Sequence, residues 1–493
     1  MRKLLSFVIL INSLWGFHYF TKTYGKNDES EYLKKVITTQ GGYVMAGTGS
    51  QKSWILKVDS TGEVIWYRYL TGIYLDDLIV GGDAGFAGVA SLQDTIFFFK
   101  LNSNGELLNA HWYLHAENQL NINSVKIHKC TENTFYISGN ATMEENFTTY
   151  DYYYVILVDT AGNPIKSKLF SIGSSTALDN FASVSNGTNL IMCQTNSSVW
   201  GACILEIDSS MNVVWSKRFY NNTNAYGIFY PNSATEFANG FVFAGKRDAG
   251  IEYNIALVAI DSSGNPLWFS IYKSSPAGSR DEAIDVSKSS SGLVIAGNGS
   301  VGSFIIYLKT DESGNLQWSK KFSDPGGHSV RASAICQTGV GPYLIGGKFD
   351  KNAYWDYLLF TVTTDGDFPA ACGYFSDINM SDSICPLQSE NIPVSSSSFN
   401  LLHGEYSLGG FPFEVSTLCG VATSIDENGC NCGYERGNLL LRSLPLERSH
   451  FYRVFSNNGR LIYQGHGKTL ILPVGIYIVK DLKGESEKVI ILK

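Results

Sequence analysis

The stretch that decides the fold lies near the start of the chain. It reads Gly42-Tyr43-Val44-Met45-Ala46-Gly47, then Lys57-Val58-Asp59-Ser60-Thr61-Gly62, then Trp66. Each part is a short apolar strand bounded by turn residues. Asp59 at the head of a tight turn can accept backbone N–H bonds, and Gly62 supplies a positive φ. Trp66 then falls on the returning strand, where its ring can fill the space between two packed sheets.

Both phrases recur along the chain about every fifty residues. The turn phrase returns as Asn102–Gly105, Asp159–Gly162, Asp208–Met211, Asp261–Gly264, Asp311–Gly314 and, in a degenerate form, Thr363–Gly366. A tryptophan follows the aspartate by seven residues at Trp66, Trp215, Trp268 and Trp318, whereas Asn109 and Lys166 stand there in two other copies. Met211 replaces the glycine once, so that turn must be built differently or be strained. Self-similarity at this period indicates a β-propeller or another β array.

Composition agrees with an all-β chain. The 493 residues include 49 Gly, 28 Tyr and 28 Phe, which suits short strands joined by tight turns. Hydrophobic residues make up 44% and charged residues 17%, enough apolar material for a large core. The net charge of −8 argues against a nucleic-acid partner held by phosphate contacts.

The sequence also predicts how the ring closes. The strand after each turn has an aromatic-x-basic pattern, as in Trp66–Leu70, and Phe20-Thr21-Lys22-Thr23-Tyr24 matches it without earlier strands of its own. The residues after Gly366 lack such a copy. We therefore expect a seven-bladed β-propeller over residues 17–373, in which Phe20–Tyr24 completes the last blade and removes the free edges. The alternative is that Phe20–Tyr24 is a disordered tail.

On these residues the chain resembles the delta-60-type repeat propellers of exported bacterial and archaeal proteins. The resemblance covers roughly residues 17–370 and implies the propeller fold. It implies little about function, because propellers host many activities.

The N-terminus predicts export. Arg2 and Lys3 precede an apolar run, Leu4–Trp15, which fits a signal peptide of residues 1–16 cleaved near Gly16, with Gly25 as the other possible site. The alternative is a short membrane anchor. No later stretch offers about 18 uninterrupted apolar residues, so we expect no transmembrane segment in the mature chain.

Residues 374–432 are expected to be a cysteine-containing linker region. Five of the nine cysteines lie between positions 372 and 432, and a disulfide there would staple a small module. Cys430 and Cys432 form a C-x-C pair, for which a metal site is the less favoured interpretation because no second close pair and no nearby histidine accompany it.

The last sixty residues carry a different charge and a second resemblance. Residues 434–493 have a net charge of +5. Their N-x-x-G turn at Gly459, the Gly475-Ile476-Tyr477 strand and the Lys488-Val489-Ile490-Ile491-Leu492-Lys493 ending are similar to the type A C-terminal sorting domain of the type IX secretion system of Bacteroidota. The resemblance implies a small β-sandwich over residues 433–493, a secretion translocon as partner, and a protein that is secreted or attached to the outer-membrane surface. The Tyr-Pro-Asn-Pro phrase that often opens such domains is absent. The alternative is an ordinary small β-sandwich.

A search for catalytic motifs finds none. His111 and His115 lack the glutamate of H-E-x-x-H, and neither G-x-S-x-G nor a P-loop occurs. Asp76-Asp77 is expected in a solvated turn, and Asp365-Gly366-Asp367 lacks the further ligands of a calcium loop. We therefore expect no catalytic residue, no metal and no cofactor, and assign the Asp, Gly and Trp residues of the turns to structure.

One segment is a candidate ligand-binding surface. The third unit carries an insertion, residues 142–154, in which Tyr150, Tyr152 and Tyr153 offer contact area with polar tips for a surface glycan or a protein. The alternative is that these tyrosines belong to the following strand.

The sequence thus predicts an exported, non-catalytic binding, adhesion or scaffold module. An alternative is a secreted enzyme that acts on polysaccharide through acidic residues on one face of the ring. A third possibility is an envelope assembly factor.

Overall fold

The structure is a computed structural model whose described residues form strands and turns. They are 19–25, 29–49, 52–115, 120–145, 148–174, 180–196, 201–220, 228–238, 240–248, 250, 252–274, 280–299, 303–337, 341–351, 354–369, 373–384 and, beyond that, the strands alone. The chain divides into two compact units, Met1–Tyr434 and Glu435–Lys493.

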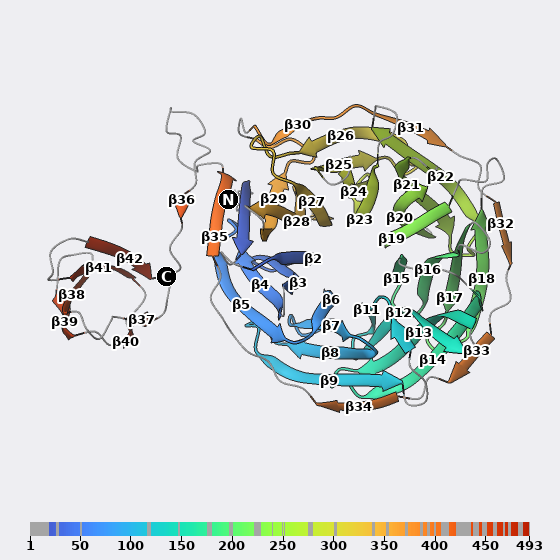
Figure 1. Cartoon of the computed structure of the whole chain (residues 1–493), viewed down its shortest axis with the longest axis horizontal. Helices are drawn as coiled ribbons and strands as arrows, with labels where there is room; N and C mark the ends of the chain where they lie inside the picture. The colour runs from blue at the N-terminus through green and yellow to red at the C-terminus, as the bar shows by residue number, and fades with distance from the viewer. Residues whose placement is uncertain are drawn as a thin grey trace, which may run out of the picture. The chain divides into compact units, whose positions relative to one another are not determined.

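The first unit is a seven-bladed β-propeller, in which antiparallel sheets surround a common axis (Figure 1). Blade 1 holds β2 (Glu31–Thr39), β3 (Gly42–Gly49), β4 (Lys52–Asp59) and β5 (Val64–Thr71). Blade 2 holds β6 (Tyr74–Val80), β7 (Phe86–Leu92), β8 (Thr95–Leu101) and β9 (Leu107–His115), and blade 3 holds β10 (Leu120–Ile122), β11 (Lys126–Thr131), β12 (Thr134–Glu145), β13 (Thr148–Asp159) and β14 (Pro164–Ser174). Blade 4 holds β15 (Phe181–Ser185), β16 (Leu190–Asn196), β17 (Gly201–Ile207) and β18 (Val213–Tyr220), and blade 5 holds β19 (Ile228–Phe237), β20 (Gly240–Asp248), β21 (Tyr253–Asp261) and β22 (Pro266–Ser274). Blade 6 holds β23 (Glu282–Ser289), β24 (Gly292–Gly299), β25 (Phe304–Thr310) and β26 (Leu316–Phe322), and blade 7 holds β27 (Val330–Gln337), β28 (Tyr343–Lys351), β29 (Tyr354–Val362) and β1 (Phe20–Gly25).

The N-terminal strand β1 closes the ring. It pairs antiparallel with β29, and Thr23 lies opposite Leu358. All six residues of β1 are buried. The Tyr24 hydroxyl donates to the Gly62 carbonyl of blade 1 at 2.8 Å, so the first and last blades are tied together. This is the closure that the aromatic-x-basic pattern predicts.

The core lies between the blades. In the described part of the chain the buried apolar side chains form seven clusters, one at each junction of neighbouring blades. Phe98 of blade 2 packs with Phe135 of blade 3, for example, and Trp54 of blade 1 packs with Tyr357 of blade 7. Apolar burial of this kind favours a complete ring, because an open ring would expose two such faces.

The repeated turns lock each blade to the next. In blade 1 the Asp59 carboxylate accepts the N–H groups of Thr61 and Glu63, and Gly62 adopts φ 79°. The Trp66 ring lies over Gly105 of the next turn, and its Nε1 donates to the Ser103 carbonyl at 3.2 Å. Four more rings cover the equivalent glycines in the same way, namely Trp215 over Gly264, Trp268 over Gly314, Trp318 over Gly366 and Phe20 over Gly62. The Asp311 turn has the same hydrogen bonds as the Asp59 and Asp261 turns.

Met211 follows the same turn under strain. Its backbone is left-handed at φ 58°, and its N–H still donates to the Asp208 carbonyl at 2.8 Å. The side chain is fully buried. The preceding blade has Lys166 where other blades have tryptophan, so the methionine side chain fills the space that a ring covers elsewhere.

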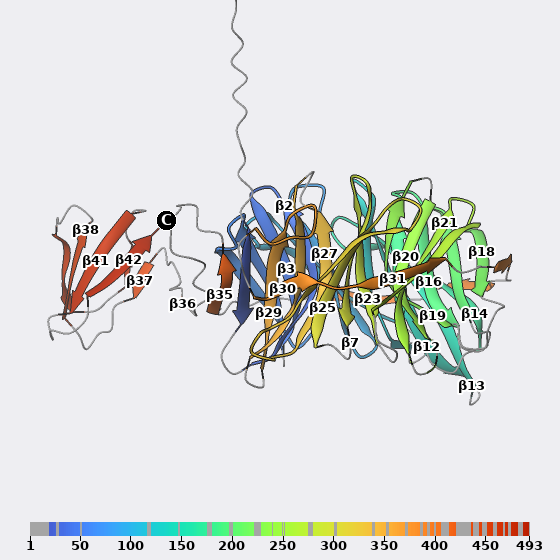
Figure 2. The same cartoon turned by 90° about the horizontal axis from the view of Figure 1, so that it is seen from above.

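The region expected as a linker contributes strands to the propeller. β30 (Phe375–Asp377), β31 (Met380–Ile384), β32 (Gln388–Asn391), β33 (Ser395–Ser398) and β34 (Leu401–Glu405) pair antiparallel with the outer strands of blades 6, 5, 4, 3 and 2 in turn. β35 (Glu414–Gly420) pairs with β1 of blade 7. This outer belt runs round the rim against the order of the blades (Figure 1), and Figure 2 shows β30 and β31 crossing the outside of the ring. It covers strand edges that would otherwise expose unpaired N–H and C=O groups.

The second unit contains two sheets. β39 (Leu461–His466), β38 (Phe451–Ser456), β41 (Gly475–Asp481) and β42 (Glu487–Leu492) form an antiparallel sheet in that order, and β37 (Ser443–Pro445) pairs with β40 (Thr469–Ile471). The unit also begins with the two-residue β36 (Glu435–Arg436). Whether the two sheets form the expected sandwich stays a prediction.

Candidate functional site

A chamber occupies the centre of the ring and is lined by the innermost strand of each blade. It consists of a cavity of about 600 Å³ and an adjoining cavity of about 420 Å³. The two share lining residues on five blades, namely Lys34, Lys126, Asn232, Ile284 and Ser333. The chamber therefore belongs to the whole ring and to no single repeat.

β-Bulges direct the side chains into this chamber. The pairing of β2, β6, β19, β23 and β27 with the next strand slips by one residue at the same place. The extra residues are Lys34, Asp76, Asn232, Ile284 and Ser333, and all five line the larger cavity. In four of these strands the following residue, Lys35, Asp77, Ser233 or Asp285, lines the smaller one. A bulge re-aims side chains and is typical of functional edges and rims.

The glycine that ends the Ala-Gly phrase accommodates the bulge. A side chain at Gly47 would lie 2.2 Å from the Tyr32 carbonyl, and one at Gly245 would lie 1.8 Å from the Tyr230 carbonyl. Gly297 and Gly347 face the carbonyls of Glu282 and Arg331 in the same way. The glycine thus accompanies four of the five bulges, whereas blade 2 has Ala90 in its place.

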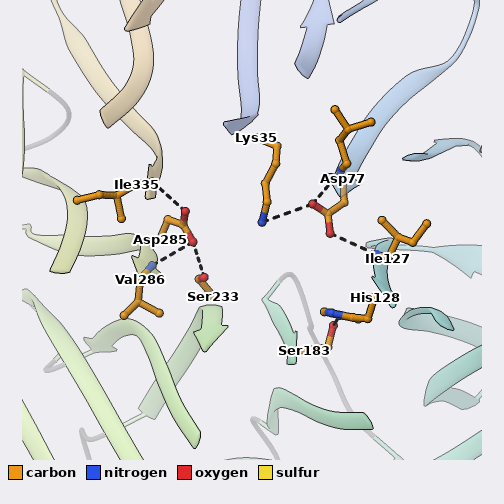
Figure 3. A network of polar contacts seen from close by, with 10 residues as sticks. Lys35, Asp77, Ile127, His128, Ser183, Ser233, Asp285, Val286 and Ile335 are labelled. Carbon is orange, nitrogen blue, oxygen red and sulfur yellow. Dashed lines mark hydrogen bonds and ion pairs between the residues drawn. The ribbon is translucent and has the colours of Figure 1, made fainter. Parts of the chain in front are cut away.

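An ion pair lies at the centre of the smaller cavity (Figure 3). Lys35 Nζ lies 3.6 Å from Asp77 Oδ1, and the Asp77 charge, with that of Asp285, raises the pKa of Lys35. Burial alone would raise the pKa of Asp77, but the positive charges of Lys35 and Lys126 outweigh it and hold that pKa below its usual value. Both groups are therefore charged at neutral pH.

The two chamber aspartates also join neighbouring blades. Asp77 Oδ2 accepts the Ile127 N–H of blade 3 at 3.2 Å, and Asp285 Oδ2 accepts the Ile335 N–H of blade 7 at 2.9 Å. Asp285 Oδ1 additionally accepts the Ser233 hydroxyl at 2.5 Å (Figure 3). Carboxylates held in this way are fixed acceptors.

His128 and Ser183 form a contact on the opposite side of the smaller cavity from Asp285 (Figure 3). His128 Nε2 lies 2.7 Å from Ser183 Oγ. Burial lowers the pKa of His128 to about 4, so the ring is neutral at physiological pH. Ser183 is buried and also contacts the Ser138 hydroxyl at 3.2 Å, so the pair is a hydrogen-bonded part of the wall.

Asp76 differs from its neighbour Asp77. It lies in β6, within the bulge, so the expectation of a solvated turn is wrong. Burial raises the pKa of Asp76 to about 6, although the Ser91 hydroxyl donates to it at 2.6 Å. The bulge therefore places two carboxylates of different acidity in adjoining cavities.

The larger cavity has a cationic wall. Lys34, Lys126, Arg331 and Lys348 line it together with a single carboxylate, Asp76. Within the described part of the chain no ion pair joins any of these four cations to a carboxylate. Burial, followed by the charges of Arg331 and Lys34, lowers the pKa of Lys348 to about 8. On a chain with a net charge of −8, this wall has the opposite sign.

The tyrosines proposed as ligand contacts lie on a long hairpin. The insertion extends β12 and β13, so Tyr150, Tyr152 and Tyr153 all belong to β13. Tyr153 is fully buried, and its hydroxyl donates to the Cys203 carbonyl of blade 4 at 2.6 Å, which makes it a core residue. Tyr150 and Tyr152 are half-buried, and a role for them in binding stays a prediction.

The remaining predicted residues fall in several places. Gly475 and Tyr477 lie in β41 and Lys488 in β42, while Gly459 and the expected signal peptide lie outside the described residues. Cys430, Cys432 and most of the cysteine-rich segment also lie outside them. Cys130, Cys193, Cys203 and Cys336 are free thiols.

His111 packs over Gly162, where other blades place a tryptophan ring. No helix in the described residues has the length and apolarity needed to span a bilayer.

Comparison with known proteins finds only distant similarities to solved structures. No protein-family model and no curated protein sequence matches the chain. A solved chain of hydrazine synthase from Kuenenia stuttgartiensis is similar at 9% identity and a TM-score of 0.46, over 67% of this chain and 95% of that one. A Lactobacillus plantarum protein is similar at 12% identity and a TM-score of 0.35, over 71% and 98%. A subtype N10 neuraminidase-like protein of A/little yellow-shouldered bat/Guatemala/060/2010 is similar at 7% identity and a TM-score of 0.34, over 70% and 97%.

These similarities are too distant to carry an argument about activity. The fold itself defines the class: the chain is a seven-bladed β-propeller protein with an outer belt and a second, β-stranded unit.

Proposed function

We propose that this protein is an exported or cell-surface binding module without catalytic activity, and that its ligand occupies the central chamber. One observation carries the proposal: bulges on five inner strands turn side chains into the chamber, and the four cations on the larger cavity's wall, of which Lys34 is a bulge residue, form no ion pair in the described structure. Unpaired charges in a cavity cost stability and are typical of ligand sites.

The chamber supports binding better than chemistry. Asp77 and Asp285 accept backbone N–H groups, and Ser183 is buried beside a neutral histidine. A nucleophile needs an accessible reacting atom and a base that can take its proton. Ser183 is buried and bonded to Ser138, and a pKa of about 4 makes His128 a weak base, so this pair is poorly suited to nucleophilic attack.

A blocking substitution tests the location of the site. Ser333 lies in the β27 bulge and lines both cavities but belongs to neither apolar cluster of blade 7, so Ser333→Trp places a large ring in the chamber and should leave the inter-blade packing intact. Ligands found by a thermal-shift screen of saccharides and small metabolites should raise the melting temperature of the wild type and leave the variant unmoved. A ligand that binds both forms equally would place the site elsewhere.

Export is supported by the N-terminal apolar run and by the resemblance of residues 433–493 to a sorting domain. Intact-mass and terminal-peptide analysis of protein from culture medium and cell surface tests it. A product that begins near Phe17 and lacks the C-terminal unit supports export and processing. A cell-retained product that still ends at Lys493 would contradict the sorting role and would favour an assembly factor.

A second candidate function, hydrolysis of a polysaccharide, is favoured by the Asp76–Asp77 pair. One carboxyl has a raised pKa and its neighbour a lowered one, as a general acid and its partner require. Release of reducing ends from acidic polysaccharides, abolished by Asp76→Asn, would support an enzyme. Binding without release would support the module.

A further inference from the structure

Two cations face each other across the wall of the larger cavity. Arg331 on β27 and Lys348 on β28 are direct cross-strand partners, and both line that cavity. Like charges in this position are destabilising. Arg331 is itself exposed, so water screens part of this repulsion, and an anion bound between the two groups would relieve the remainder.

Two further cations strengthen the same field. Lys34 from the β2 bulge and Lys126 from β11 line the cavity with Arg331 and Lys348, against the single carboxylate of Asp76. A cavity with low-dielectric walls focuses such a field and raises the local concentration of anions. The lowered pKa of Lys348 is what an uncompensated ammonium group shows.

Aromatic rings hold the central cation in place. Lys348 Nζ lies 4.4 Å from the centre of the Tyr32 ring and 4.9 Å from that of Trp355. The Arg331 guanidinium lies 5.8 Å from the same Trp355 ring. Cation–π contacts keep the two groups positioned without neutralising them. The charges are therefore preorganised for a ligand.

Amide and hydroxyl groups complete the cavity. Its lining includes Asn123, Asn180, Asn232, Asn298, Ser124 and Thr48. Asn180 Nδ2 donates to Asn232 Oδ1 at 2.5 Å, and Asn298 Oδ1 accepts the Ala332 N–H at 2.8 Å, so these amides are fixed in orientation. Fixed amides that retain further donors and acceptors suit a ligand with several hydroxyl groups.

We propose that the larger cavity binds an acidic saccharide, whose carboxylate or sulfate lies between Arg331 and Lys348 and whose hydroxyl groups face the asparagines. The inference rests on the proposed function and names its ligand class. The cavity of about 600 Å³ has the size of a small-molecule site and accommodates about two sugar rings.

Calorimetry on the purified full chain tests the ligand class. The probes are digalacturonate, the neutral disaccharide galactobiose, and inorganic sulfate. We expect digalacturonate to bind at least about tenfold more tightly than galactobiose or sulfate, because only digalacturonate offers both the charge and the hydroxyl groups. Equal binding of the acidic and neutral sugars would overturn the proposal. Sulfate binding as tightly as digalacturonate would overturn its saccharide part.

Variants locate the anion. The double substitution Arg331→Gln with Lys348→Gln should weaken digalacturonate binding by about a hundredfold, since each charged hydrogen bond contributes about tenfold or more. Lys309→Gln, which removes one half-buried lysine outside the chamber, should leave binding unchanged. An unchanged affinity in the double variant would refute the assignment, and its melting temperature shows whether it is folded.

The outcomes separate this proposal from the proposed function. A neutral sugar that binds the wild type but not Ser333→Trp would keep the chamber as the site and reject the acidic ligand. A digalacturonate affinity that survives Ser333→Trp would reject the chamber itself.

Discussion

The inner and outer edges of the blades obey different rules. At the outer edge, six of the seven turns place a glycine at positive φ, and an aromatic ring or His111 of the preceding blade covers each one. At the inner edge, five strands share one bulge, yet the bulged residues are two charged groups of opposite sign, an amide, an apolar residue and a hydroxyl: Lys34, Asp76, Asn232, Ile284 and Ser333.

The contrast separates residues that stabilise the ring from residues that line the chamber. The turn and the ring that covers it must be alike at every junction, because each pair of neighbouring blades has the same packing requirement. The bulge fixes only where a side chain points and leaves its chemistry open. Substitutions at the outer edge should therefore change stability, and substitutions at the inner edge should change binding.

Breaking the ring closure should have the largest effect on stability. Thr23 lies in β1 with β29 on one side and β35 on the other, opposite Leu358 and Ser416. Thr23→Pro removes a ladder N–H inside the sheet and should lower the free energy of unfolding by at least about 3 kcal/mol. Thr23→Val keeps the N–H and is the matched control. Thermal melts of equal midpoint for the two variants would show that closure by β1 contributes little.

Two glycines separate backbone strain from ring packing. Gly41 has φ 83° with nothing near its missing side chain, whereas Gly264 has φ 72° with the Trp215 ring 2.8 Å away. Gly41→Ala should cost about 1 kcal/mol of strain alone. Gly264→Ala adds overpacking and should cost about 2–3 kcal/mol. Equal losses in chemical denaturation would mean that the ring does not tighten the turn.

The junction between blades 3 and 4 tests whether tryptophan and methionine are alternative solutions. Lys166 donates to the Ser210 carbonyl there, and buried Met211 replaces the glycine. Met211→Gly relieves strain but leaves a cavity, and Lys166→Trp brings a ring against the methionine, so each alone should destabilise the fold. The double variant restores the common arrangement.

We expect a favourable coupling free energy of about 1 kcal/mol between these two sites. A double-mutant cycle by chemical denaturation measures it. Purely additive effects would show that the two positions do not share a packing space.

Much of this fold could be predicted from the sequence. The turn phrase can be interpreted from sequence, because the turn depends only on local residues: the aspartate side chain accepts backbone N–H groups, and the glycine adopts a positive φ. Closure of the ring by Phe20–Tyr24 could equally be predicted, since that strand repeats the pattern of the outer strands. The belt was not, because Ser395-Ser396-Ser397-Ser398 has no strand pattern of its own and forms β33 only through backbone pairing with β14.

The chamber could be predicted only in part. A glycine marks four of the five bulges, but nothing in a single repeat shows that Arg331 and Lys348 will line one cavity with Lys34 and Lys126 of other blades. Such groups meet through closure of seven blades, which is a long-range property. The tyrosine insertion shows the same limit: the sequence left open whether Tyr153 is a ligand contact or part of the following strand, and long-range packing against blade 4 makes it a buried strand residue.

The last prediction leaves the fold untouched and concerns the pH dependence of binding at Lys348. Its pKa is lowered to about 8, so the free chamber loses this positive charge as the pH rises through 8. The groups that face it are Arg331 of β27, Lys34 and Tyr32 of β2, and Trp355 of β29. Digalacturonate affinity should therefore fall by about tenfold between pH 7 and pH 9.5, since each pKa unit corresponds to a factor of ten.

Asp76, with its pKa near 6, acts in the same direction, because its protonation below that pH removes a negative charge from the cavity and should raise the affinity. Lys348→Arg keeps the charge and should bind equally well at pH 7 and pH 9.5, because a guanidinium does not titrate in this range. An identical loss of affinity in Lys348→Arg would exclude this lysine as the group that titrates. The pH dependence of binding at the inner edge would then have to come from the remaining cations of the chamber.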